Sequence, residues 1–93
     1  MKFEIDDEEF DPQNEVPPII AKMLGVLQSM PDGKLYTTRR LAQEIGHSTD
    51  TTNNYATHVA LNEYRIKATT RGVRRRLFGN AATIKAYREQ LNV

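Results

Sequence analysis

The sequence predicts a mainly α-helical domain with a small β-hairpin, in the order helix, short strand, helix, helix, strand, strand, helix. Apolar residues recur at three- and four-residue spacing from residue 19 to residue 30, as on one face of a helix. A Leu-Ala-x-x-Ile-Gly stretch at residues 41–46 precedes a polar turn, a pattern typical of two short packed helices. An alternating segment at residues 65–70 and a second strand-like segment at residues 73–78 flank a turn that contains glycine.

The composition limits the classes of protein to which the chain can belong. Its 93 residues predict one domain, and the absence of cysteine excludes disulfides and thiolate chemistry. No apolar run approaches the roughly 18 residues of a membrane helix. The acidic start differs from the basic start of a signal peptide. We therefore expect a cytoplasmic protein, associated with the nucleoid if the source is bacterial.

Charge is distributed unevenly along the chain. Residues 1–18 contain seven acidic residues and one lysine, whereas residues 19–93 contain twelve basic and five acidic residues. We expect residues 1–16 to form a flexible acidic tail and residues 17–93 to form the folded domain. A short edge strand through Phe3 and Ile5 is the alternative. The tail would act as a solubilising leader, or would fold back on the basic domain and compete with a polyanion.

The first helix is expected to begin at Pro17-Pro18, because proline fits the first helical position. Pro31-Asp32-Gly33 would end it with a turn, and Gly25 would mark a close crossing by another helix. A short strand is expected at residues 34–36.

Thr37 is expected to cap the second helix, and Gly46 to end it. The third helix is expected over residues 52–64, capped by Thr49 or Asp50. A helical wheel divides this segment into two faces. The inner face would hold Tyr55, Ala56, Val59 and Ala60, and the outer face Asn53, Asn54, Thr57, His58 and Leu61.

Residues 65–70 and 73–78 are expected to pair as a hairpin, with Gly72 at positive φ in the turn. Asn80 would cap a last helix carrying Ile84, Tyr87 and Leu91. This order of elements is that of a winged helix-turn-helix, with residues 65–78 as the basic wing.

The predicted third helix offers side chains that suit the edges of DNA bases. Asparagine pairs with adenine through two hydrogen bonds, threonine contacts the thymine methyl, and histidine donates or accepts at a base edge. The candidates are therefore Asn53, Asn54, Thr57 and His58. A polar face that only contacts water is the alternative.

The wing carries six basic residues and no acidic one within twelve positions, which favours a polyanionic partner. They are Arg65, Lys67, Arg71, Arg74, Arg75 and Arg76. Arg71, at the tip, is the candidate for insertion into a narrow minor groove. A merely soluble basic hairpin is the alternative.

The start of the second helix supplies weaker candidates. Arg39 and Arg40 would lie where this helix crosses the phosphate backbone, and Thr37 could add a hydrogen bond to a phosphate. Cations at a helix N-terminus oppose the helix dipole, a cost that a nearby phosphate would offset.

No pattern of a catalytic or metal site is present in the sequence. Paired carboxylates occur only in the acidic tail, no phosphate-binding glycine loop is present, and His47 and His58 lack metal-ligand spacing. We therefore expect a protein that is not an enzyme and has no cofactor.

The segment VLQSMPDGKLYTTRRLAQEIG, residues 26–46, resembles the DNA-binding domain of the O6-alkylguanine methyltransferases, and residues 20–78 resemble the winged-helix DNA-binding superfamily. The methyltransferase acceptor lies in a Pro-Cys-His-Arg motif, and catalytically inactive relatives keep Pro-x-His-Arg. This chain has neither motif. The resemblance therefore implies the fold, and not lesion repair.

The leading expectation is a protein that binds double-stranded DNA, acting in transcription regulation or as a DNA-handling accessory. Two alternatives are an RNA-binding winged helix and a protein-interaction module that uses Leu61 and Tyr64 as an apolar contact patch.

Overall fold

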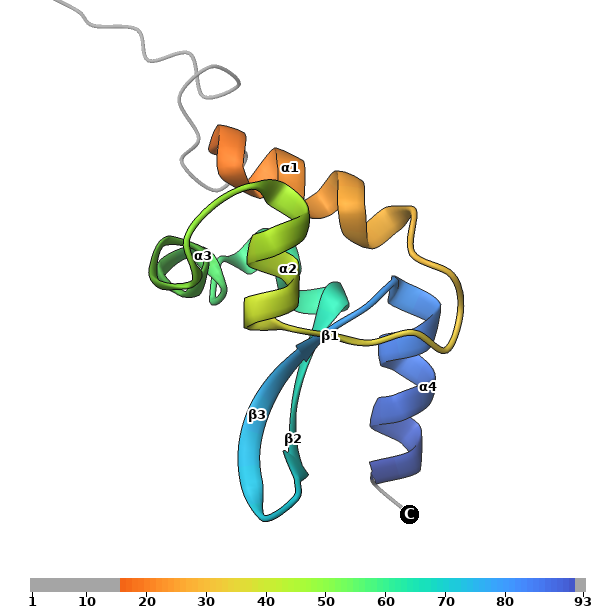
Figure 1. The fold of residues 1–93 in the computed structure, drawn as a ribbon. Coiled ribbons are helices and arrows are strands. Elements are labelled where there is room, and N and C mark those ends of the chain that lie inside the picture. Colours follow the sequence, from red (N-terminus) through yellow and green to blue (C-terminus); the bar gives the residue numbers. More distant parts are fainter. Residues whose placement is uncertain (1–15, 92–93) are drawn as a thin grey trace, which may run out of the picture.

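The computed structural model describes residues 16–91, and the expected acidic tail lies outside them except for Val16. The described chain is mainly helical, with five helical segments and one three-stranded antiparallel sheet (Figure 1). The helices are α1 (Pro18–Gln28), α2 (Thr38–Ile45), α3 (Thr49–Tyr55), the 3-10 helix η1 (Val59–Tyr64) and α4 (Ala81–Leu91); the strands are β1 (Tyr36–Thr37), β2 (Arg65–Thr70) and β3 (Val73–Phe78). None of these helices is long and apolar enough to cross a membrane.

Helix α1 begins as expected, with Pro17 at the N-cap and Pro18 at the first helical position. It ends at Gln28, before the Pro31-Asp32-Gly33 turn. Its buried face packs against α2, α3 and η1 to form the core. The prediction that Gly25 lies at a helix crossing is wrong, because nothing lies within 4 Å of the position where its side chain would be.

Helix α2 has the predicted cap at each end. The Oγ1 of Thr37 accepts a hydrogen bond from the backbone N–H of Arg40 at 3.2 Å. Gly46 ends the helix in the left-handed region at φ 73°, where a residue with a Cβ is disfavoured.

The prediction of one continuous helix over residues 52–64 is wrong. Helix α3 begins earlier, with Ser48 as its cap through a 3.1 Å bond from the N–H of Thr51, and it ends at Tyr55. His58 has an extended backbone and caps the 3-10 helix η1, accepting a hydrogen bond from the N–H of Ala60 at its Nδ1. The chain therefore turns between α3 and η1, and one helical wheel cannot describe both.

The turn reverses several assignments of inner and outer residues. Leu61 was expected on the outer face, but its exposed fraction is 0% and it belongs to the core cluster. Tyr64 is half-buried and packs on the same core. Val59, which was expected inside, is 55% exposed. Leu61 and Tyr64 therefore do not form an exposed apolar patch.

The sheet has the strand order β1-β3-β2, and its two long strands have the predicted bounds. Strand β1 lies against the end of β3, with Tyr36 opposite Phe78. Arg71 and Gly72 form the hairpin turn with φ of 52° and 78°, both in the left-handed region, as a two-residue turn between twisted strands requires.

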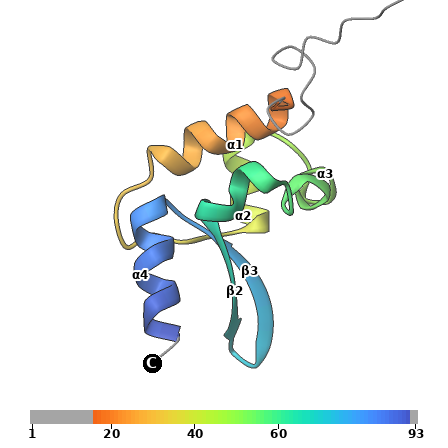
Figure 2. The ribbon, with the colours of Figure 1, turned by 180° about the vertical axis from the view of Figure 1, so that it is seen from behind.

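Helix α4 is held at its start by Asn80. The Oδ1 of this residue accepts a hydrogen bond from the N–H of Thr83 at 2.7 Å, and its Nδ2 donates to the carbonyl of Met30 at 2.9 Å. Seen from both sides, the β2–β3 hairpin and α4 extend in the same direction from the helical body (Figures 1 and 2). Ile84 is buried, whereas Leu91 is 49% exposed.

Candidate nucleic-acid interface

The register of the hairpin determines which basic side chains share a face. Lys67 is directly opposite Arg76, and Arg74 is directly opposite Thr69, so these side chains lie on one face of the sheet. Arg75 is opposite Ala68 and lies on the other face. The six hairpin cations are therefore divided between two faces and the tip.

The positive charge of the hairpin is uncompensated within the described chain. Among residues 16–91 the single ion pair joins Arg40 to Glu44, and no ion pair involves the hairpin. Lys67, Arg71, Arg74 and Arg75 are all exposed. They are available to a polyanion from solution.

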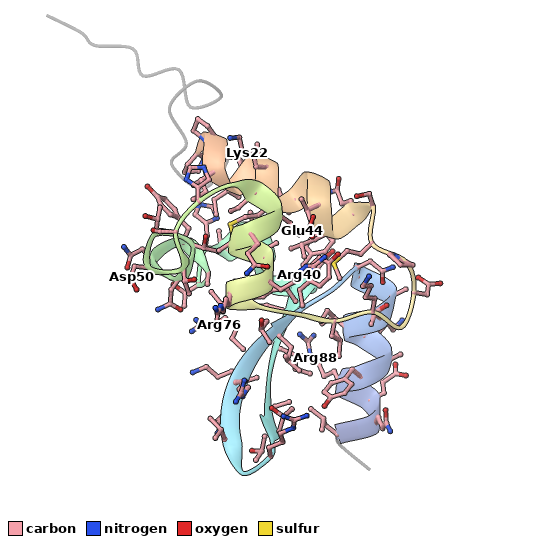
Figure 3. All side chains as sticks on the ribbon, in the orientation of Figure 1. Lys22, Arg40, Glu44, Asp50, Arg76 and Arg88 are labelled. Carbon is pink, nitrogen blue, oxygen red and sulfur yellow. The ribbon has the colours of Figure 1, made fainter. Side chains whose placement is uncertain are left out.

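A hollow of about 580 Å³ lies on the Lys67–Arg76 face of the hairpin. Its lining comes from three parts of the chain: the α3–η1 segment, the hairpin and α4. It includes five cations and no acidic residue: Arg65, Lys67, Arg74, Arg76 and Arg88, together with Thr57, Asn62 and Ile66. Figure 3 shows Arg76 on the side of the hairpin that faces α3, and Arg88 on the side that faces α4.

Arg65 was predicted as a nucleic-acid contact, but its side chain is half-buried and braces the fold. Its guanidinium donates to the backbone carbonyl of His58 and to the Oδ1 of Asn62. Burial, and then the positive charge of Arg76, lower the pKa of Arg65. The residue joins the hairpin to the η1 turn and lines the hollow mainly as a fixed charge.

Helix α3 is connected directly to the hairpin through Asn53. The Nη1 of Arg76 donates to the Oδ1 of Asn53 at 3.0 Å, so the exposed side of α3 and the basic face of β3 are adjacent. Asn54 is exposed on the same helix. Of these two candidates, Asn53 therefore lies next to the hairpin.

Thr57 and His58 do not lie on α3, because the helix ends before them. Thr57 is exposed and lines the hollow beside the hairpin cations. His58 is half-buried, and its Nδ1 and carbonyl both hold internal hydrogen bonds. His58 therefore caps η1 instead of lying on a helix face, and its contact with a base stays a prediction.

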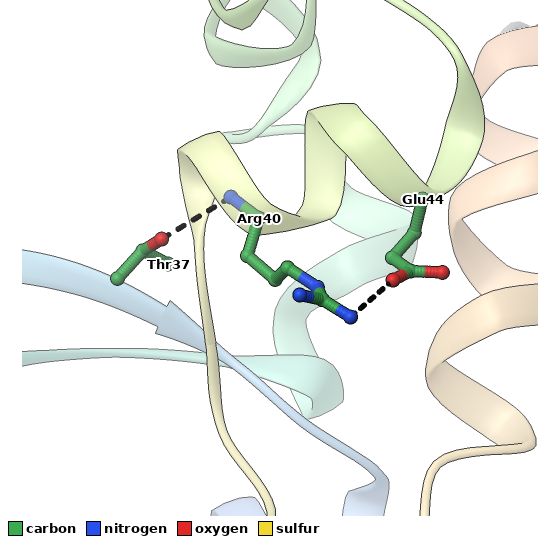
Figure 4. Close-up of polar contacts among 3 residues, drawn as sticks. All are labelled: Thr37, Arg40 and Glu44. Carbon is green, nitrogen blue, oxygen red and sulfur yellow. Dashed lines mark hydrogen bonds and ion pairs between the residues drawn. The ribbon is translucent and has the colours of Figure 1, made fainter.

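The start of α2 holds the remaining candidates (Figure 4). Arg40 forms an ion pair with Glu44 at 2.7 Å, and its guanidinium lies 5.3 Å from the centre of the Tyr36 ring. Its charge is therefore partly neutralised. Arg39 is exposed, while the hydroxyl of Thr37 already accepts the capping bond.

Sequence reasoning missed two residues that the fold brings to this surface, Asn62 and Arg88. The Nη2 of Arg88 reaches from α4 to the carbonyls of Asn62 at 3.5 Å and Arg65 at 3.4 Å. Its position one helical turn after Ile84 was the available signal, since Ile84 marks the inner face of α4. Within residues 16–91, no three side chains gather in a way that could hold a metal ion.

Comparison of the chain with protein-family models, with curated protein sequences and with solved structures finds no match in any of the three.

Proposed function

We propose that this protein binds double-stranded DNA without catalysing a reaction, and that its fold is a winged helix-turn-helix. The fold assignment is supported by the element order α1-β1-α2-α3-η1-β2-β3-α4 and by the sheet order β1-β3-β2. In that arrangement α2 and α3 are the helix-turn-helix pair, and the β2–β3 hairpin is the wing.

One observation carries the proposal: a continuous surface in which a polar helix and an uncompensated basic hairpin are hydrogen-bonded together. The Arg76–Asn53 bond connects them, and no acidic residue lies in the hairpin. Duplex DNA presents regularly spaced phosphates beside base edges, so it matches both parts at once.

The two parts have different roles in the proposed complex. Helix α3 enters the major groove with Asn53 and Asn54, whose amides can pair with adenine. The hairpin contacts the backbone, and Arg71 at its tip reaches toward the minor groove. Because α3 has seven residues, with the chain turning away after Tyr55, the base-reading surface is shorter than residues 52–64. We therefore expect modest sequence selectivity and an affinity dominated by charge.

Titration of duplex DNA by fluorescence anisotropy over a salt series tests the proposal. If about six phosphates are neutralised, the logarithm of the affinity falls with the logarithm of the salt concentration at a slope of about −5. A flat salt response, or no binding to a random duplex at low salt, would overturn it. Duplex RNA in the same assay separates DNA from RNA binding.

Two variants and a control assign the roles within the surface. Arg74→Ala should weaken binding to all sequences alike and reduce the salt slope by about one, because it removes a phosphate contact. Asn54→Ala should instead change the preference among sequences. Lys85→Ala, on α4 and outside the hollow, is the control for loss of charge alone.

The structure removes the named basis of the protein-interaction alternative, because Leu61 is buried and Tyr64 packs on the core. We therefore keep nucleic-acid binding as the candidate function, with duplex DNA as the proposed partner and duplex RNA as the comparison in the assay. The DNA sequences that the protein prefers would then distinguish a role in transcription regulation from a role in DNA handling.

A further inference from the structure

We propose that the hollow between the hairpin, the η1 segment and α4 is a specific binding site for a phosphate group. The five cations that line it are Arg65, Lys67, Arg74, Arg76 and Arg88. The site deepens the proposed function and rests on it in part, since one occupant would be a backbone phosphate of bound DNA. The other source of the same chemistry is a free phosphorylated ligand.

Bringing these five positive charges together costs free energy when no anion lies among them. Lys67 and Arg76 are directly opposite each other on paired strands, where like charges destabilise a sheet. Burial lowers the pKa of Arg65, and the positive charge of Arg76 lowers it further, a sign of repulsion between the two guanidinium groups. A bound anion would convert this repulsion into attraction.

The arginine side chains of the hollow have neutral hydrogen-bond partners. The guanidinium groups of Arg65, Arg76 and Arg88 donate only to neutral amide and carbonyl oxygens within residues 16–91. No carboxylate of the described chain lines the hollow. The cations are thus held in position by neutral groups while their charge remains available.

The side chains that line the hollow are of the types that bind phosphate groups. Arginine presents a planar fork that binds phosphate oxygens in pairs, and lysine adds a compact charge. Thr57 and Asn62, also in the lining, supply neutral donors. A volume of about 580 Å³ exceeds that of a single phosphate and can admit a phosphodiester or a pyrophosphate with its neighbouring groups.

Titration of the full chain with inorganic pyrophosphate at low salt, followed by amide NMR shifts, tests the site directly. We expect saturable shifts centred on residues 57–67 and 74–76. Arg88→Gln and Lys67→Gln should each weaken pyrophosphate binding about fivefold or more, because each removes one charged contact. Lys85→Gln, three residues before Arg88 and outside the hollow, should change it less than about twofold.

Two results would overturn the site. Shifts that do not saturate would mean that pyrophosphate binds without a defined location. Equal weakening by Arg88→Gln, Lys67→Gln and Lys85→Gln would mean that only the net charge matters. Unfolding curves of the variants separate a loss of binding from a folding defect. Among residues 16–91, the exposed side chain of Lys67 makes no hydrogen bond whose loss would disturb the fold.

A second titration with duplex DNA identifies the source of the phosphate. If a backbone phosphate occupies the hollow, Arg88→Gln reduces the salt slope by about one. If pyrophosphate binds but Arg88→Gln leaves DNA affinity unchanged, the site serves a free phosphorylated ligand. Pyrophosphate binding without any DNA binding would overturn the proposed function and leave the site standing, and DNA binding without pyrophosphate binding would do the reverse.

Discussion

The two ends of the β2–β3 hairpin differ in almost every physical property. At the root, where the hairpin joins the helical body, Leu77 and Phe78 are buried and Arg65 is hydrogen-bonded to the η1 turn. Gly79 follows at once, and a Cβ there would lie 3.0 Å from the carbonyl oxygen of Lys34. The root is therefore closely packed, with little room for a larger side chain.

The tip makes none of these contacts. Arg71, Gly72 and Val73 are exposed, and Val73 has 51% of its surface accessible. Arg71 also adopts φ 52°, a region that costs an ordinary L-residue roughly 1–2 kcal/mol. A residue kept exposed in a strained conformation contributes little to folding. The difference teaches that the root serves the fold, whereas the tip is free to take the role in DNA binding that we propose for it.

The largest expected effect is on the free energy of unfolding, and it should differ between the two ends of strand β3. Phe78→Ala should lower the free energy of unfolding by about 3–5 kcal/mol, because it opens a cavity in the core. Val73→Ala, at the exposed end of the same strand, should change it by less than about 0.5 kcal/mol. Urea denaturation measures both. Should Phe78→Ala unfold the chain outright, Phe78→Leu provides a milder loss of about 1 kcal/mol. Equal losses of stability from the substitutions at Phe78 and Val73 would contradict the proposed difference between root and tip.

An intermediate effect is expected where the root carries charge. Arg65→Met retains the aliphatic stem but leaves the carbonyl of His58 and the amide of Asn62 without their donor, so it should destabilise by about 1–2 kcal/mol. Lys67→Met lies two residues along the same strand and on the same face, yet is exposed. Removing it should leave stability unchanged within about 0.5 kcal/mol, or raise it slightly by relieving repulsion with Arg76. A larger loss for Lys67→Met would contradict the assignment of Arg65 as a brace.

Those parts of the fold that depend on local chemistry could be predicted from the sequence. The hairpin follows from two-residue alternation around Gly72, and the caps at Thr37 and Asn80 follow from side chains that bond to nearby backbone. Gly46 ends α2 because only glycine adopts its conformation readily. Each of these signals lies within a few residues of its effect.

The break after Tyr55 was missed because the helical wheel assumes that one helix continues. The segment TDTTNNYATH contains mostly threonine and asparagine, whose side chains compete for backbone hydrogen bonds and weaken a helix. This composition was the signal for a short α3. The error moved Leu61 from the core to the surface and placed His58 on a helix face instead of at the cap of η1.

The hollow could not be predicted, because it needs three segments far apart in the sequence. Arg88 contacts the carbonyl of Asn62 across 26 residues, and Arg76 contacts Asn53 across 23. The charges of the hairpin were visible in the sequence, but their grouping around one space depends on where α4 and η1 pack.

The smallest expected effect is at the tip, where one substitution should raise the stability of the protein and lower its affinity for DNA. Arg71→Asn should raise the free energy of unfolding by roughly 0.5 kcal/mol, because asparagine tolerates the left-handed region and Asn-Gly favours this turn. The same change should weaken DNA binding about fivefold by removing the tip cation. Arg75→Asn also removes one cation, but from an ordinary strand position where asparagine is disfavoured, so it should not stabilise the protein. Denaturation and DNA anisotropy on both variants separate strain from charge. If Arg71→Asn gains no stability, the strain at the tip is not a cost retained for binding, and the contrast between root and tip reduces to burial alone.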